Sequence, residues 1–173
     1  MKFADIPQLT YGTYEVDIHA RYLKKALESY KEDYGLELNP DFQRGNVWTE
    51  EQQIAFVEFF LRGGKSARTI YFNIGEWSNE KDTDIPHMVC VDGLQRLTSM
   101  LKFLNNEIPA FGAYFNEFED RIANENTFKF NINNLAYKKD VLKWYLEMNT
   151  GGTVHSDAEI QRVTEMMKEL EKE

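Results

Sequence analysis

The chain is organised around one stretch, His87-Met88-Val89-Cys90-Val91-Asp92-Gly93-Leu94-Gln95-Arg96-Leu97-Thr98-Ser99-Met100-Leu101. Its first part, Met88 to Val91, is a short apolar run rich in β-branched residues, which predicts a strand. Its second part predicts a helix that continues to about Asn106, because apolar residues recur at helical spacing. These are Leu97, Met100, Leu101 and Leu104. The stretch therefore predicts a strand that turns sharply into a helix.

The turn between these two elements carries an acid, a glycine and a Gln-Arg pair. The start of a helix has unpaired N–H groups and a dipole that favours an anion. Arg96 adds a planar cation suited to phosphate, and Asp92 could hold a divalent cation or orient a water. The residues therefore favour a phosphate-binding corner. Two structural alternatives stay open: Asp92 closes the turn or caps the helix, and Arg96 is an ion-pair partner for an acid.

Composition limits the classes of function. A length of 173 residues suits one domain, and 42% hydrophobic and 14% aromatic residues predict a globular chain. The formal net charge is −9, which argues against a broad electrostatic grip on DNA or on an anionic membrane. A small basic pocket remains compatible with this charge.

Cys90 is the only cysteine in the chain, so an intramolecular disulfide is excluded and a reducing compartment is favoured. We interpret Cys90 as a buried strand residue. Neither a signal peptide nor an apolar span is recognisable, so we expect a soluble cytoplasmic protein without a membrane partner. The three histidines are far apart and lack the spacing of a zinc site.

The first third of the chain predicts a strand at 13–16 and then a helix capped by Asp17. The predicted helix buries residues at about every fourth position and ends at Gly35. These are Ile18, Tyr22, Ala26, Tyr30 and Tyr34. A brief strand at 36–38 leads into an irregular loop over 39–48, which contains Pro, Gly and Asn.

The remaining elements are read from caps and periodicity. Capping boxes at 49–52 and 156–159 open two helices. The aromatic stretch from Phe111 to Phe118 is interpreted as core. The order of elements lacks regular βαβ alternation, so we predict the α+β class, with a small mixed sheet. The other predicted elements are strands at 69–74 and 128–132 and a helix at 137–148.

Two Gln-Arg pairs stand out, Gln43-Arg44 in the irregular loop and Gln95-Arg96 at the corner. Each places an amide that can donate and accept next to a fixed cation. Brought together, they would clamp a phosphate, and the turn after Asn149 would add backbone N–H donors. The alternatives are that Gln43 and Arg44 only hold their loop to the sheet and that the Asn149 turn only ends a helix. Trp48 is interpreted as a core residue or a pocket wall.

These motifs, in this order, resemble the N-terminal domain of GmrSD-type restriction proteins. That family shows an (I/V)P-x-(F/Y)-QR motif, a DGQQRLT motif and a later N-x-GG turn. The resemblance covers roughly residues 36 to 162. The matching segments are Asn39-Pro40-Asp41-Phe42-Gln43-Arg44, Val91-Asp92-Gly93-Leu94-Gln95-Arg96-Leu97-Thr98 and Asn149-Thr150-Gly151-Gly152.

The resemblance implies a single domain over 1–173 with a ParB/sulfiredoxin-like fold and a nucleotide-binding pocket. It also implies hydrolysis of a nucleoside triphosphate (NTP) with Mg²⁺, linked in relatives to DNA cleavage. Asp92 would be the metal ligand and, with Arg96, the catalytic group. The residues implied to bind nucleotide are Gln43, Arg44, Gly93, Gln95, Arg96 and Asn149.

Three departures from the family qualify these implications. Leu94 replaces the first Gln of the QQ pair, which weakens the case for hydrolysis more than the case for binding. The chain carries no pattern of an HNH nuclease domain. In sulfiredoxin the cysteine lies in the turn itself, whereas Cys90 precedes the turn, so a reductase is disfavoured.

Three hypotheses follow from the sequence. The first is a nucleotide-binding module, an Mg²⁺-dependent NTPase in its fullest form, of a DNA-directed restriction or defence system. The second is a non-catalytic protein that binds or regulates a restriction complex, for example through a nuclease partner. The third is direct DNA binding or nicking, which the acidic charge disfavours. The sequence leaves the nucleotide and the oligomeric state open.

Overall fold

The computed structural model describes residues 14–43, 45, 47–78, 82–150 and 157–170. At its centre lies a four-stranded sheet with the order β1-β4-β2-β3. β1 pairs antiparallel with β4, β4 parallel with β2, and β2 antiparallel with β3. The sheet is therefore mixed, and the predicted α+β class is confirmed. The strands are β1 (Tyr14–His19), β2 (Thr69–Ile74), β3 (Met88–Asp92) and β4 (Thr127–Asn133).

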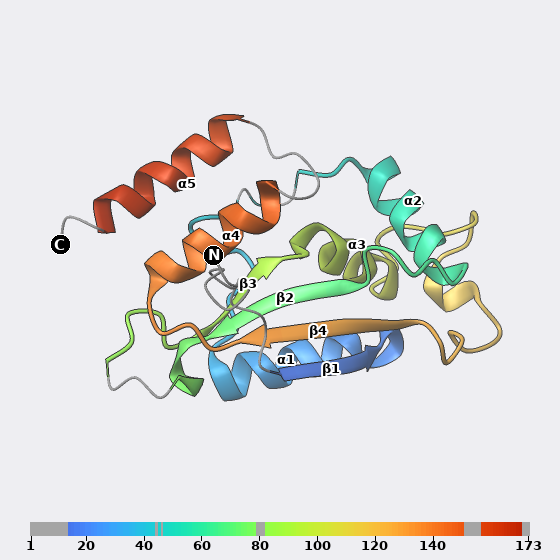
Figure 1. Cartoon of the computed structure of the whole chain (residues 1–173). Coiled ribbons are helices and arrows are strands. Elements are labelled where there is room, and N and C mark those ends of the chain that lie inside the picture. The colour runs from blue at the N-terminus through green and yellow to red at the C-terminus, as the bar shows by residue number, and fades with distance from the viewer. Residues whose placement is uncertain (1–13, 44, 46, 79–81, 151–156, 171–173) are drawn as a thin grey trace, which may run out of the picture.

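Five α-helices cover the two faces of the sheet (Figure 1). One face packs against the first three helices, α1 (Leu23–Tyr34), α2 (Glu50–Leu61) and α3 (Leu94–Leu104). The other face packs against α4 (Lys138–Thr150), on which α5 (Asp157–Leu170) lies. Short 3-10 helices, labelled η2 (Ala20–Tyr22), η3 (Gly75–Trp77) and η4 (Phe115–Glu117), complete the described elements.

The alternation of side chains along the strands explains the two layers. On β4, Phe128, Phe130 and Ile132 point to one face and are fully buried there. Phe128 stacks on Phe60 of α2, with ring centroids 4.5 Å apart. Because side chains alternate between the two faces of a strand, every second residue of β4 lies in the main core.

A second, smaller core lies under α4. Val89 and Val91 of β3 pack there with Phe42 and with the inner side of α4. Tyr71 of β2 meets Trp144 edge to face, with ring centroids 5.9 Å apart. Burial of β3 on both faces agrees with its continuous apolar sequence. As predicted, the inward residues of α4 include Val141, Trp144 and Tyr145.

The boundary between the first strand and the first helix was predicted wrongly. Asp17 is not a helix cap but lies inside β1, opposite Lys129 of β4. The α-helix begins only at Leu23, and the side chain of Tyr22 is 52% exposed. The buried face of α1 is instead built on Leu23 and Leu27. Pairing with β4 extends the strand beyond Ile18, where the helical period of the sequence begins.

Two further predictions need correction. The strand expected at 36–38 reduces to an isolated bridge between Glu37 and Val89. The aromatic stretch expected in the core is largely at the surface, since Phe111 is 54% exposed and Tyr114 and Phe118 are also exposed. The helix predicted from the capping box at 156–159 begins at Asp157, but Ser156 lies outside the described residues.

The capping box at the start of α2 is confirmed. The side chain of Thr49 accepts from Gln52 N, and the Gln52 side chain accepts from Thr49 N at 2.9 Å. Within the described residues, no helix is both long and apolar enough to cross a membrane.

Candidate functional site

The corner between β3 and α3 is the centre of the candidate site. Gly93 precedes α3 with a φ of 110°, and a Cβ at this position would lie 2.5 Å from Ile70 Cδ1. Only glycine fits both the positive φ and this close approach. The N-cap residue is this glycine, so it supplies no side chain to cap the first turn of α3 by a hydrogen bond. The first turn of α3 therefore offers backbone N–H groups to an anion.

Arg96 is fixed at this corner by three groups. One guanidinium nitrogen, Nη1, donates to Thr69 O at 2.9 Å and to Ala67 O at 3.1 Å. The other, Nη2, forms an ion pair with Asp92 Oδ2. The Arg96 side chain is 15% exposed and that of Asp92 35% exposed. The ion pair is therefore accessible from solvent on the carboxylate side, while the guanidinium is anchored to the start of β2.

Gln43 holds the 39–48 loop to the edge of β3. Its Nε2 donates to Val91 O at 2.7 Å and to Cys90 O at 3.2 Å. The backbone N–H of Gln43 donates to Pro40 O at 2.8 Å, which closes a turn. This is the loop-holding role left open by the sequence. Arg44, the second member of the pair, lies outside the described residues.

Gln95 holds the other end of the same loop. Its Oε1 accepts from Val47 N at 3.0 Å and from Trp48 N at 3.1 Å, and its Nε2 donates to Gly45 O. Trp48 packs against Phe56 of α2, with ring centroids 5.7 Å apart. The two glutamines thus bring the loop and the corner together, although they are about fifty residues apart in sequence.

Asn149 lies in the last turn of α4, and its side chain is outside the described part of the chain. The helix itself contacts β3, so its backbone runs on the same side of the sheet as the 39–48 loop. The structure therefore brings Gln43, Asp92, Gly93, Gln95 and Arg96 into one region.

Leu94, the departure from the family motif, is 93% buried and packs in the main core. The side chain at this position faces inward, away from the polar atoms of Asp92 and Arg96. An apolar residue is therefore suited to the position.

Cys90 is buried, as predicted. Burial, and next the charge of Asp92, raises the pKa of the Cys90 thiol far above its ordinary value. A thiol kept protonated in the core is unsuited to nucleophilic chemistry. Within the described residues, no group of three or more His, Cys, Asp or Glu side chains is placed to hold a metal ion.

Sequence reasoning missed the cations that fix the loop from the other side. Arg162 of α5 donates to Phe42 O at 2.7 Å and to Asp41 O at 2.8 Å. Lys138 of α4 forms an ion pair with Asp41, with an N–O distance of 2.6 Å. Their partners are mostly backbone carbonyls, which carry no signature of residue type, so no sequence signal marks them.

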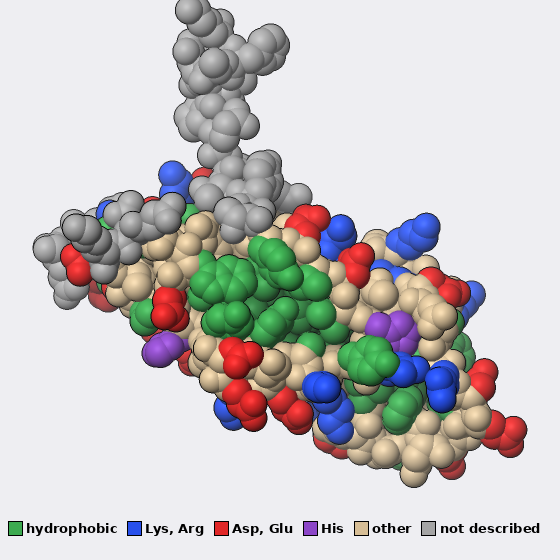
Figure 2. All heavy atoms as spheres, turned by 90° about the horizontal axis from the view of Figure 1, so that it is seen from below, with side chains coloured by type: hydrophobic (Ala, Val, Ile, Leu, Met, Phe, Trp, Pro, Cys, Tyr) green, Lys and Arg blue, Asp and Glu red, His purple; other side chains and the backbone are tan. Residues whose placement is uncertain are grey.

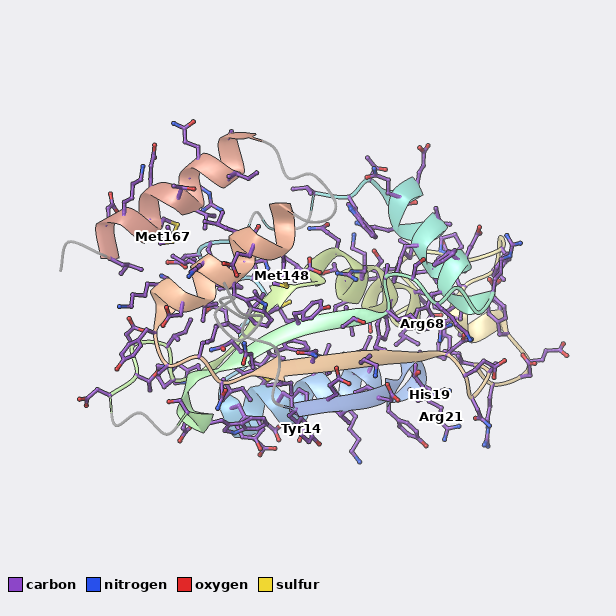
Figure 3. All side chains as sticks on the ribbon, in the orientation of Figure 1. Tyr14, His19, Arg21, Arg68, Met148 and Met167 are labelled. Atoms are coloured by element: carbon purple, nitrogen blue, oxygen red, sulfur yellow. The ribbon has the colours of Figure 1, made fainter. Side chains whose placement is uncertain are left out.

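Arg68 is a further cation that the sequence did not single out (Figure 3). It lies just before β2 and donates to Gly64 O, to Glu125 O at 2.5 Å and to Asn126 Oδ1 at 3.2 Å. Its guanidinium also sits over the Phe60 ring, 4.8 Å from the centroid. These contacts give Arg68 a structural role that resembles the anchoring of Arg96.

A comparison with protein families matches residues 23–149 to the N-terminal domain of the GmrSD restriction endonuclease. The matched range contains the Gln-Arg loop, the corner and all but the last residue of α4. The chain belongs to this family. No curated protein and no solved structure matched the chain. The GmrSD N-terminal family links the chain to restriction and defence systems, and it agrees with the resemblance drawn from the motifs.

Proposed function

We propose that this GmrSD N-terminal domain binds a nucleoside triphosphate, with the phosphates at the N-terminus of α3. The observation that carries the proposal is the Asp92–Arg96 ion pair at an uncapped helix start. A guanidinium in the first turn of a helix adds a planar cation to backbone N–H groups that favour an anion, a combination suited to a phosphate. Membership of a restriction endonuclease family supports a role for such a site in a DNA-directed system.

Phosphate binding would exchange one partner of Arg96 for another. The hydrogen bonds to Ala67 O and Thr69 O keep the guanidinium in place, while its Nη2 is shared with Asp92. A phosphate oxygen competes with the carboxylate for this nitrogen. In the proposed complex Nη2 bonds the phosphate, and Asp92 becomes free.

A freed Asp92 suits Mg²⁺. Magnesium is usually bound by one or two carboxylates together with the phosphates of the substrate, and Asp92 supplies the carboxylate at this corner. The ion would neutralise phosphate charge. For hydrolysis, Asp92 would also orient the attacking water, and Arg96 would stabilise the negative charge that develops on the transferred phosphoryl group.

Isothermal titration calorimetry with the four NTPs, with and without Mg²⁺, tests the proposal. Arg96→Lys keeps the charge but loses the planar fork, so we expect affinity to fall about tenfold. Arg68→Lys is the matched control, because the Arg68 guanidinium also bonds backbone carbonyls, but those of Gly64 and Glu125 and not the two that anchor Arg96. Binding that Arg96→Lys leaves unchanged, or that Arg68→Lys weakens equally, would contradict the proposal.

Asp92→Asn separates the two roles of the carboxylate. Without Mg²⁺, the variant should bind NTP about fivefold more tightly, because it lacks the carboxylate that competes with the phosphate for Arg96. A partly exposed ion pair of this kind is worth about 1 kcal/mol. With Mg²⁺, the variant should lose the gain in affinity that the ion gives to the unmodified chain. Loss of binding in both conditions would assign Asp92 a purely structural role.

A second candidate is a non-catalytic protein that acts on a restriction complex, for example through a nuclease partner. The side chains of Gln43, Gln95 and Arg96 all bond backbone groups of the protein itself, as a purely structural role requires. A steady-state phosphate-release assay distinguishes the two. Turnover that is lost in Asp92→Ala would reject the non-catalytic protein, and absence of both turnover and NTP binding would favour it.

A further inference from the structure

β1 is an edge strand of the sheet. Within the described residues its only strand partner is β4. An edge strand presents N–H and C=O groups that a further strand can pair with. The strand is regular over its whole length, from Tyr14 to His19, and its six residues pair with β4 without a bulge. β1 thus offers a template for a fifth strand.

Next to this edge lies a group of aromatic side chains, here called the edge patch: Tyr14, Tyr30, Tyr34 and Trp77. The Trp77 ring meets those of Tyr14 and Tyr34 edge to face, with centroids 5.9 and 5.3 Å away. Figure 2 shows hydrophobic side chains gathered on the underside of the molecule, where α1 and β1 lie, and Figure 3 shows Tyr14 at the start of β1. Tyr14 is 47% exposed. Rigid amphipathic rings of this kind are typical of interfaces.

The opposite face of β1 is acidic. Glu15 and Asp17 alternate with the apolar residues, and both are exposed. Lys129 of β4 forms an ion pair with Glu15, at 3.3 Å; it is also the cross-strand neighbour of Asp17, but Asp17 makes no ion pair with any described residue. A segment paired with β1 would meet apolar rings on one face and carboxylates on the other. Cross-strand pairs favour opposite charges and large apolar neighbours.

We propose that the outer edge of β1 and the edge patch dock an extended segment of a partner protein in which large apolar residues alternate with lysine or arginine. A second copy of this chain fits less well, because self-pairing would place the carboxylates of both β1 strands on one face. The net charge of −9 also favours a basic partner over a second copy. This docking is independent of nucleotide binding at the α3 corner.

Fluorescence polarisation with two synthetic probes tests the docking. Each probe has roughly eight residues, enough for one strand. One alternates lysine with valine and tyrosine, and the other carries glutamate in place of lysine. The lysine probe should bind the full chain, and the glutamate probe should bind at least about tenfold more weakly. Equal binding of both probes, or no binding of the lysine probe, would overturn the proposal.

Two pairs of variants locate the binding. Asp17→Lys should weaken binding of the lysine probe about three- to tenfold, whereas Glu169→Lys, with the same change in charge on α5, should not. Tyr14→Ala should weaken binding of both probes, and Phe111→Ala, at a similarly exposed aromatic residue outside the patch, should leave binding unchanged. Equal effects within either pair would contradict the assignment.

Hydrogen exchange and sedimentation complete the test. Probe binding should slow amide exchange in β1 more than in β3. Greater slowing in β3 than in β1, or no slowing at all, would overturn the assignment to β1. A dimer in sedimentation velocity that Tyr14→Ala abolishes would assign the edge to a second copy and would overturn the proposal as well.

Discussion

Gly93 is constrained both by its backbone conformation and by its packing. Any side chain here meets the positive φ of 110°, and a Cβ also meets the buried Ile70. Gly93→Ala should therefore reduce the free energy of unfolding by about 3 kcal/mol, the sum of backbone strain and overpacking. Urea unfolding followed by circular dichroism measures this loss.

Gly112→Ala is the matched control for Gly93→Ala. Gly112 also has a positive φ, 79°, but a Cβ there has no neighbour within 4 Å. Gly112→Ala should reduce the free energy of unfolding by only about 1 kcal/mol, from backbone strain alone. Equal losses in the two variants would show that the contact with Ile70 does not constrain the corner.

Cys90 provides a test of pH dependence. Because burial raises the pKa of its thiol, the folded chain keeps a proton that the unfolded chain releases above its ordinary thiol pKa. Below about pH 8 the thiol is protonated in both states, and stability does not depend on it. Above that pH, the free energy of unfolding should fall as pH rises, and that of the Cys90→Ala variant should fall less steeply.

A thiol reagent should label Cys90 only in unfolded protein. Rapid labelling of the folded chain would contradict the burial of this thiol.

The residues of the candidate site were found from the sequence, but most of their partners were not. The Asp92–Arg96 pair has the (i, i+4) spacing that a sequence can reveal. The carbonyl partners of Arg96 and Gln95 come from segments 27 to 50 residues away. Every residue type carries a carbonyl, so no pattern of letters predicts such contacts. The anchoring of the site is thus a property of the tertiary fold.

At the scale of elements, caps and strong periodicity were reliable guides. β2, β3, β4 and the helices α2 to α4 follow from the sequence because each pattern agrees with the packing of its element. The N-terminal segment carries two patterns at once: Tyr14, Val16 and Ile18 alternate, while the residues from Ile18 onward also fit a helical period. Pairing with β4, more than 100 residues away, decides for the strand. Local sequence does not contain that information.

The capping box of α2 yields a prediction at this scale. Thr49→Ala removes the acceptor for Gln52 N and should cost about 1 kcal/mol of stability. Gln52→Ala removes the reciprocal bond, and the double variant should lose less than the sum of the two, because the bonds belong to one motif. Thermal and urea unfolding of the three variants measures the coupling. Strict additivity would contradict a cooperative box.

For the whole molecule, the charge makes a prediction about DNA. With 29 acidic and 20 basic residues, the isolated chain should not bind duplex DNA appreciably at about 0.15 M salt. A gel-shift assay over a range of salt concentrations measures this. A shift that persists at this salt concentration would favour the DNA-binding hypothesis over the nucleotide-binding module.

The central claim is that Arg96 exchanges Asp92 for a phosphate. A crystal structure with Mg²⁺ and the NTP that binds most tightly in calorimetry tests it most directly. We predict a phosphate at the N-terminus of α3, bonded to Arg96 Nη2, with Asp92 turned to the metal ion and the bonds of Arg96 to Ala67 and Thr69 retained. A nucleotide bound elsewhere, with the Asp92–Arg96 ion pair intact, would contradict the account.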